Sequence, residues 1–170
     1  RLGNNGRIQV DVPGSLRINK IVNAAEGFEG SLADFNDTTF NFKVTFTGIN
    51  NTEYSYYQYT DDTQKGVVKT MEDDGDGIVE FTLSGGETIE FIGLPKDVQY
   101  KVEETADVNF SSQVEDKGTG VIAANDQSVV DVTNTLAAGD VALDASASLN
   151  VRKLFEGRDT TDTDEFTFEI

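Results

Sequence analysis

Residue types that many proteins use for chemistry or cross-linking are missing from this sequence of 170 residues. It contains no Cys, no His and no Trp, with 2 Pro and 1 Met. Without Cys, the chain has neither disulfides nor a thiolate nucleophile. Without His, it lacks the usual general base and the most common metal ligand. We therefore expect no cofactor, no bound metal and no enzyme that turns over a substrate.

Positive charge is also scarce. Lys and Arg number 13 against 31 Asp and Glu, which gives a formal net charge of −18. Nucleic acids and anionic membranes bind basic surfaces, so neither is expected as a partner. No apolar run is long enough for a membrane helix, and no secretory signal is visible. The sequence begins at Arg1 and stops within an apolar pattern at Ile170, so we expect a piece of a longer extracellular protein.

Short β-strand patterns separated by turn residues dominate the sequence. Residues 40–46, 77–83 and 88–92 alternate in polarity or are rich in β-branched and aromatic residues. Clusters of Gly, Asn and Asp lie between such runs, and no long window has the apolar period of a helix. Residues 30–35 fit one helical turn. The pattern predicts an all-β protein with the fold of an antiparallel β-sandwich.

The sequence contains an internal repeat. Residues 6–20 recur as residues 139–153 without a gap, and Gly, Asp, Ser, Leu and Lys are identical at corresponding positions. Because the second copy is cut off, we expect one complete domain and part of another. The predicted division is an N-terminal segment at 1–13, a complete β-sandwich at 14–136, a linker at 137–146 and a truncated second domain at 147–170.

Three polar residues occupy positions where the strand pattern predicts apolar side chains. Lys20, Glu104 and Asn134 each share the parity of the aliphatic or aromatic residues in their own strand. Successive strand residues point to opposite faces, so all three are predicted to point inward. A buried amine, carboxylic acid and carboxamide are the reactants and the catalyst for an amide bond between Lys20 and Asn134.

Burial explains how such a bond would form. It disfavours the charged forms of an amine and a carboxylic acid, so Lys20 becomes nucleophilic and Glu104 protonated. Lys20 then attacks the carboxamide carbon of Asn134, while Glu104 hydrogen-bonds the carbonyl oxygen and relays protons so that ammonia leaves. The reaction occurs once per molecule. Each residue alone also fits an ordinary role: a lysine extending to solvent, a glutamate turned outward by a bulge, or an asparagine in a turn.

The segments around these residues resemble a known family. Residues 16–20, 93–104 and 132–135 look like the three landmarks of Cna-B-type domains, which build the shafts of Gram-positive pilins and the stalks of surface adhesins. The resemblance implies a transthyretin-like or inverse immunoglobulin-like sandwich. It also implies an intramolecular isopeptide bond between Lys20 and Asn134, assisted by Glu104. No pilin-type sortase acceptor motif or cell-wall sorting motif is visible, so polymerisation does not follow from this sequence.

The resemblance predicts a structural function. We expect a stalk or pilus-shaft domain of a Gram-positive adhesin or pilin, extracellular and either anchored to the cell wall or incorporated into a pilus. Its partners would be neighbouring domains or pilin subunits of the same surface structure. Lys153 matches Lys20 in register and parity within the repeat, so we expect Lys153 to be the nucleophile of a second bond in the next domain.

An alternative function is a ligand-binding adhesin tip module that recognises a host protein or glycan on the same scaffold. The tyrosine run at residues 54–59 favours it if exposed, although one alternating pair is expected in the core. Residues 72–77 have the spacing of half a calcium loop, but Leu83 stands where a carboxylate ligand is required. We expect a solvated hairpin turn there. Nothing marks a glycosidase-like carboxylate pair among the 31 acidic residues.

Overall fold

The computed structural model describes residues 11–28, 30–73 and 75–136. The predicted linker at 137–146 and the predicted second domain at 147–170, with Lys153, lie outside these residues.

The described residues form strands joined by turns and two short 3-10 helices. The helical turn predicted at residues 30–35 is confirmed as η1 (Leu32–Phe35), and η2 spans Glu115–Gly118. The strands are β1 (Gly14–Ala24), β2 (Thr39–Thr47), β3 (Glu53–Tyr59), β4 (Lys69–Glu72), β5 (Ile78–Ser84), β6 (Thr88–Leu94), β7 (Gln99–Glu104), β8 (Phe110–Val114), β9 (Thr119–Val121) and β10 (Gln127–Leu136).

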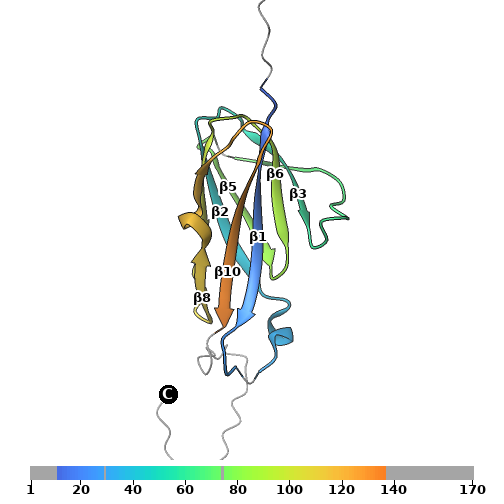
Figure 1. The fold of residues 1–170 in the computed structure, drawn as a ribbon, viewed down its shortest axis with the longest axis vertical. Coiled ribbons are helices and arrows are strands. Elements are labelled where there is room, and N and C mark those ends of the chain that lie inside the picture. Colours follow the sequence, from blue (N-terminus) through green and yellow to red (C-terminus); the bar gives the residue numbers. More distant parts are fainter. Residues whose placement is uncertain (1–10, 29, 74, 137–170) are drawn as a thin grey trace, which may run out of the picture.

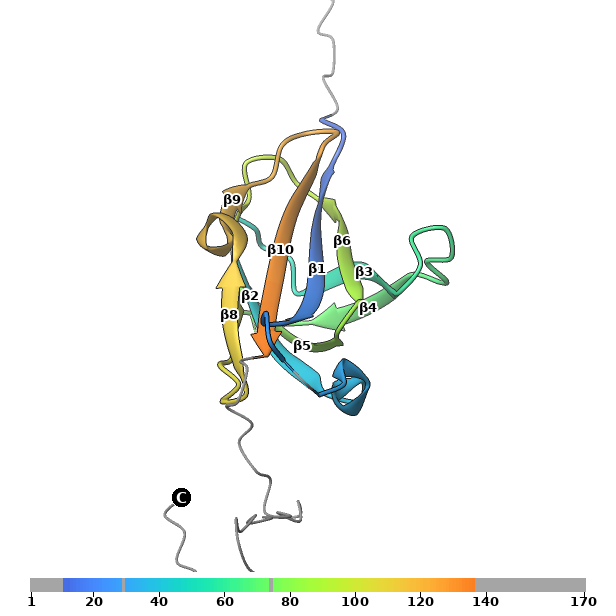
Figure 2. The same cartoon turned by 60° about the horizontal axis from the view of Figure 1, so that its bottom comes forward.

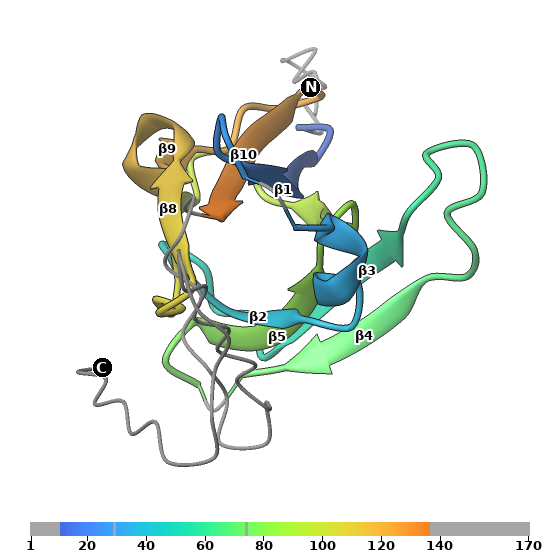
Figure 3. The same ribbon diagram turned by 90° about the horizontal axis from the view of Figure 1, so that it is seen from below.

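Two sheets pack face to face around one core (Figure 1, Figure 3). The six-stranded sheet has the order β4-β3-β6-β1-β10-β8, and the four-stranded sheet has the order β5-β2-β7-β9. Paired strands in the described residues are antiparallel, except that β1 pairs with β10 in parallel. The predicted antiparallel β-sandwich is therefore confirmed, with one parallel pair that strand patterns did not reveal.

The parallel pair determines where the chain enters and leaves the sandwich. β1 and β10 pair from Ser15 with Gln127 through to Ala24 with Leu136. They lie side by side and point the same way (Figure 1, Figure 2). A parallel pair needs a long connection between its strands, and the first and last strands of a domain provide one. The start of β1 and the end of β10 consequently lie at opposite ends of the sandwich.

Alternating side chains of facing strands form the core. Leu16 and Ile18 of β1 and Phe91 of β6 are fully buried, as is Val44 of β2 in the opposite sheet. Burying a side chain of this size stabilises the fold by ~1.5–3 kcal/mol. Phe46 of β2 meets Phe91 edge to face, with ring centroids 5.5 Å apart, and this contact joins the two sheets.

The tyrosine run belongs to β3 and contributes mainly to packing. Tyr54 is 2% exposed and stacks on Phe46 with centroids 4.8 Å apart. Tyr56 packs against the core, so these two tyrosines are the expected core pair. The buried Tyr59 hydroxyl donates to Glu90 Oε2 at 2.9 Å. The exposed large apolar side chains of the described residues are all valines, so this part of the chain presents no aromatic patch.

The acidic segment at residues 72–77 is a turn, but the prediction of a hairpin is wrong. It connects β4 to β5, and these strands belong to different sheets. Asp73 Oδ1 accepts from the Gly75 N–H at 2.6 Å, and Asp76 Oδ1 accepts from the Ile78 N–H at 3.0 Å. The carboxylates thus stabilise the turn backbone. Within the described residues, no group of three or more Asp, Glu, His or Cys side chains is placed to hold a metal ion.

Gly77 and Gly48 have similar φ angles but different surroundings, so substituting each one distinguishes a steric clash from backbone strain. Gly77 (φ 77°) ends this turn against β2, where a Cβ would overlap the Phe46 carbonyl oxygen; Gly48 (φ 86°) has open space around it. We expect Gly77→Ala to lower the free energy of unfolding by ~3 kcal/mol and Gly48→Ala by ~1 kcal/mol, because only the first adds a steric overlap. Urea unfolding followed by circular dichroism measures both, and equal losses would contradict this account.

Candidate functional site

Lys20, Glu104 and Asn134 meet between the two sheets. Lys20 lies on β1 and Asn134 on β10 of the six-stranded sheet, whereas Glu104 ends β7 of the four-stranded sheet. Their burial is nearly complete: Lys20 is 1% exposed, Asn134 is 0% exposed and the Glu104 side chain is 1% exposed. The three positions come from the start, middle and end of the domain, and the strand register assembles them.

Strand register explains how Lys20 and Asn134 approach each other. Lys20 pairs with Val132, and Val22 pairs with Asn134, so Asn134 lies one same-face position further along the neighbouring strand. Side chains in this diagonal relation start ~7–8 Å apart, a distance that a lysine side chain spans. Lys20 Nζ also donates to the Val132 carbonyl oxygen at 3.4 Å, which holds the amine against β10.

A single carboxylate contacts both potential reactants. Lys20 Nζ lies 2.9 Å from Glu104 Oε2, as an ion pair without the geometry of a directed hydrogen bond. Asn134 Nδ2 donates to the other oxygen, Oε1, at 2.7 Å. Glu104 therefore bridges the amine and the carboxamide with one oxygen each. This geometry allows a proton to pass from one nitrogen to the other through the carboxyl group.

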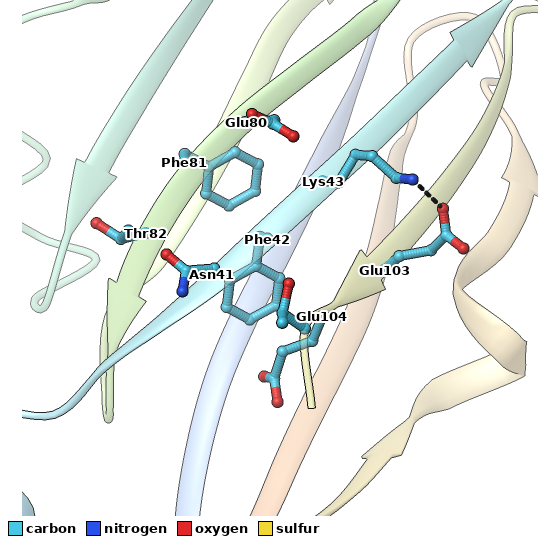
Figure 4. Close-up of a pocket in the computed structure, with 9 residues that line it drawn as sticks. Asn41, Phe42, Lys43, Glu80, Phe81, Thr82, Glu103 and Glu104 are labelled. Atoms are coloured by element: carbon cyan, nitrogen blue, oxygen red, sulfur yellow. Dashed lines mark ion pairs between the residues drawn. The ribbon is translucent and has the colours of Figure 1, made fainter. Parts of the chain in front are cut away.

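The neighbouring glutamate has a different environment. Glu103 points to the outer face of the four-stranded sheet, where Oε2 pairs with Lys43 Nζ at 3.4 Å and Oε1 accepts from Lys101 Nζ at 2.6 Å. These contacts lower the pKa of Glu103, with the Lys101 hydrogen bond as the largest cause. Figure 4 shows Glu103 and Glu104 leaving the end of β7 in different directions. Glu103 is thus a natural control for Glu104.

Two aromatic rings complete the surroundings of the amine. The Phe40 ring centroid lies 4.2 Å from Lys20 Nζ, and the Phe42 centroid lies 6.0 Å away. Burial among these groups lowers the pKa of Lys20, an effect that the nearby Glu104 carboxyl group partly opposes. The alternating pattern of β2 marked both phenylalanines as core, but it contains no signal that they face this particular lysine.

The orientation of the Asn134 amide differs from the sequence-based expectation. Glu104 was expected to hydrogen-bond the carbonyl oxygen, but Nδ2 faces it, and the buried Oδ1 has no hydrogen-bond partner. In this arrangement the amide N–H donates and the carboxyl oxygen of Glu104 accepts. A proton transferred from Lys20 would give Glu104 a donor, which either amide atom could then use.

A surface depression adjoins this site, because Phe42 and Glu104 are among the residues that line it. It measures about 600 Å³ on the outer face of the four-stranded sheet and is lined mainly by outward side chains of β2, β5 and β7 (Figure 4). Lys43 crosses it and pairs with Glu103. Sequence reasoning did not identify this surface, because outward strand positions carry polar residues with or without a function. Its lining residues include Asn41, Lys43, Glu80, Thr82, Glu103 and Thr105.

Solved structures with this fold include proteins of Streptococcus pyogenes pili. A pilus-presented adhesin (Cpa) has a TM-score of 0.55 and 17% identity, over 76% of this chain and 28% of that chain. A variant of the major pilin has a TM-score of 0.53 and 22% identity, over 74% and 49%. The major pilin itself gives 0.50 and 20%, over 74% and 48%. The chain therefore has a pilin-like β-sandwich fold and covers less than half the length of these proteins.

A family model identifies the chain more narrowly. It matches residues 14–136 and is described as "Domain of unknown function (DUF7601)". The match covers most of the 170 residues, so the chain belongs to this family. No curated protein sequence matches the chain. Among the described residues, no helix is long and apolar enough to span a membrane.

The lowered pKa of Lys20 predicts a pH effect in protein that cannot cross-link. In Asn134→Ala, the unfolded state, where the lysine pKa is 10.5, binds the Lys20 proton more strongly than the folded state does. Stability should therefore rise with pH between the lowered value and 10.5. Urea unfolding of Asn134→Ala and of Lys20→Met/Asn134→Ala between pH ~7 and ~10 isolates the effect, because only the first retains the amine. A stability difference that stays constant with pH would contradict the lowered pKa.

Proposed function

We propose that residues 14–136 form a structural stalk or pilus-shaft domain of the Cna-B type. In this proposal Lys20 Nζ and Asn134 Cγ are joined by an intramolecular isopeptide bond. The observation that carries the proposal is the bridge made by the buried Glu104 carboxylate, 2.9 Å from Nζ and 2.7 Å from Nδ2. A buried amine, acid and amide in mutual contact are placed to react with one another.

The proposed reaction balances within these three side chains. Lys20 Nζ passes one proton to Glu104, and the neutral amine attacks Asn134 Cγ. The Nζ–Cγ bond forms and the Cγ–Nδ2 bond breaks. A second proton from Nζ reaches Nδ2 through Glu104, and ammonia leaves. Glu104 ends protonated beside the new amide, so the site loses both buried charges. Fixed placement of the reactants can remove ~7–11 kcal/mol of the barrier. The chain reacts once and turns over no substrate.

The position of the bond suits a domain under tension. Pulling on the start of β1 and the end of β10 would slide two neighbouring parallel strands past each other. A Lys20–Asn134 bond would transmit that force from residues 14–20 directly to residues 134–136. The chain between Lys20 and Asn134 would then bear no tension. Closing a loop of this length would also stabilise the fold, by roughly 4–5 kcal/mol if the entropy of disulfide loops applies.

Partners and location follow from the same proposal. The pilin-like fold and the net charge of −18 support an extracellular position in a cell-wall-anchored protein or a pilus. The partners would be neighbouring domains or pilin subunits of the same surface structure. Residues 137–146 would then be a linker and residues 147–170 the start of the next domain. Lys153 remains our proposed nucleophile there.

The ligand-binding alternative has one observation in its favour. The outer depression of about 600 Å³ has the volume of a small-molecule site. Its lining carries amide, hydroxyl and charged groups, which suit a glycan or a peptide. No tyrosine of β3 lines this depression, and Tyr54, Tyr56 and Tyr59 pack inside the protein. Binding of a host protein or glycan by this surface is therefore our second candidate function.

Intact mass tests the proposed bond. We expect the wild-type protein to be lighter than its sequence by one ammonia for residues 14–136, and digestion to yield one branched peptide containing Lys20 and Asn134. Glu104→Ala should have its full sequence mass, because proton relay between the two nitrogens is lost. Glu103→Ala should match the wild type, since Glu103 faces the outer surface.

Two results would contradict the proposal. A wild-type protein of full mass, with Lys20 and Asn134 recovered in separate unmodified peptides, would exclude the bond. Complete ammonia loss in folded Glu104→Ala would show that Glu104 does not assist it.

A further inference from the structure

The reactive side chains lie close to one end of the sandwich, and something must keep water out there. Asn134 is near the end of β10 and Glu104 is the last residue of β7. Leu136, at the end of β10, is fully buried, and Phe40, near the start of β2, is 3% exposed. Phe40 lies over the amine, with its ring centroid 4.2 Å from Lys20 Nζ. Because Phe40 is too deep to meet solvent itself, other side chains cover it.

Phenylalanine side chains form that cover. Phe110 of β8 meets Phe40 edge to face, with ring centroids 5.3 Å apart and planes at 76°. Phe35 of η1 meets Phe110 in the same way, at 5.6 Å and 80°. Phe110 and Phe35 are half-buried, whereas Phe40 is buried. The rings therefore run in series from the surface, through Phe35, Phe110 and Phe40, to Lys20 Nζ.

The connection between β1 and β2 holds Phe35 in this position. The Ala25 N–H donates to the Leu136 carbonyl at 2.9 Å, which ties the start of the connection to the end of β10. Ser31 Oγ accepts from the Ala33 N–H at 3.2 Å and caps η1. The Thr38 N–H donates to the Phe35 carbonyl at 3.0 Å. These hydrogen bonds hold the backbone of the short helix that carries Phe35, and the ring contact with Phe110 links Phe35 to the site.

We propose that Phe35 is a positioning residue for the cross-linking reaction, which seals the Lys20 site against water through Phe110 and Phe40. The inference rests on the proposed isopeptide bond and adds a residue that touches none of the reacting atoms. Water at Nζ would stabilise the ammonium and the Glu104 carboxylate, and both charged forms are unreactive. An apolar plug at the mouth of the site keeps the neutral pair accessible. Any apolar side chain of similar reach should serve the same purpose.

The test follows cross-linking during cell-free synthesis of the full chain. Samples are quenched in denaturant at timed intervals, and mass spectrometry gives the fraction that has lost ammonia. We expect Phe35→Ala to react roughly tenfold more slowly. Water that reaches Lys20 Nζ would lower the neutral fraction of the amine, and a tenfold smaller fraction gives a tenfold lower rate. Phe35→Leu should react at nearly the wild-type rate. Phe28→Ala is the matched control, because this phenylalanine lies on the same connection but packs over Gly30; its rate should be unchanged.

A control shows whether Phe35→Ala still folds. The substitution is made together with Lys20→Ala, which cannot cross-link, so that folding is measured without the bond. All rates are compared at a temperature where Lys20→Ala/Phe35→Ala is fully folded by circular dichroism. Slow reaction of folded Phe35→Ala, with rescue by leucine, supports the inference. A rate equal to the wild type, or no rescue by leucine, overturns it while leaving the isopeptide bond intact. Absence of ammonia loss in the wild type overturns the proposed function and this inference with it.

Discussion

The contact between the Glu104 carboxylate and the Lys20 amine, 2.9 Å apart and buried between two sheets, is the constraint on which the rest of the structure depends. Removing two charges from water costs several kcal/mol per ion, and their attraction repays this only with good geometry and full hydrogen bonding. Here the bonding is incomplete, because Asn134 Oδ1 is buried without a partner. Such a site contributes little to the stability of the fold. It suits the proposed reaction, because the product replaces two buried charges with a neutral amide and a protonated acid.

The parallel pairing of the first and last strands explains why a bond between them would help the domain resist a pulling force. The parallel pairing of β1 and β10 brings the first and last strands of the domain together while leaving their outer ends at opposite ends of the sandwich. Backbone hydrogen bonds between two such strands would resist sliding only until they break. A covalent link across the same pair would carry the force without any change in the surrounding fold. The proposal thus accounts for the register of β1 and β10 and for the position of Glu104 on the opposite sheet with one mechanism.

Part of this could be predicted from the sequence. Alternation along a strand indicates the face of each residue, so the inward positions of Lys20, Glu104 and Asn134, and the outward position of Glu103, were predictable. Alternation does not indicate which strands pair. The parallel partner of β1, the crossing of residues 72–77 between sheets and the contact of Phe40 with Lys20 therefore depend on tertiary structure. The amide orientation of Asn134 was missed for another reason: alternation indicates the face of a side chain, but not which amide atom meets Glu104.

The central claim is that the cross-link turns the domain into an inextensible element of a stalk, and single-molecule stretching tests it most directly. Handles attached before residue 14 and after residue 136 load the chain along the proposed path. The account predicts that the wild-type domain shows no unfolding step, whereas Glu104→Ala lengthens on the order of 400 Å, at ~3.5 Å per residue of extended chain. A step of that full length in the wild-type domain would contradict the account.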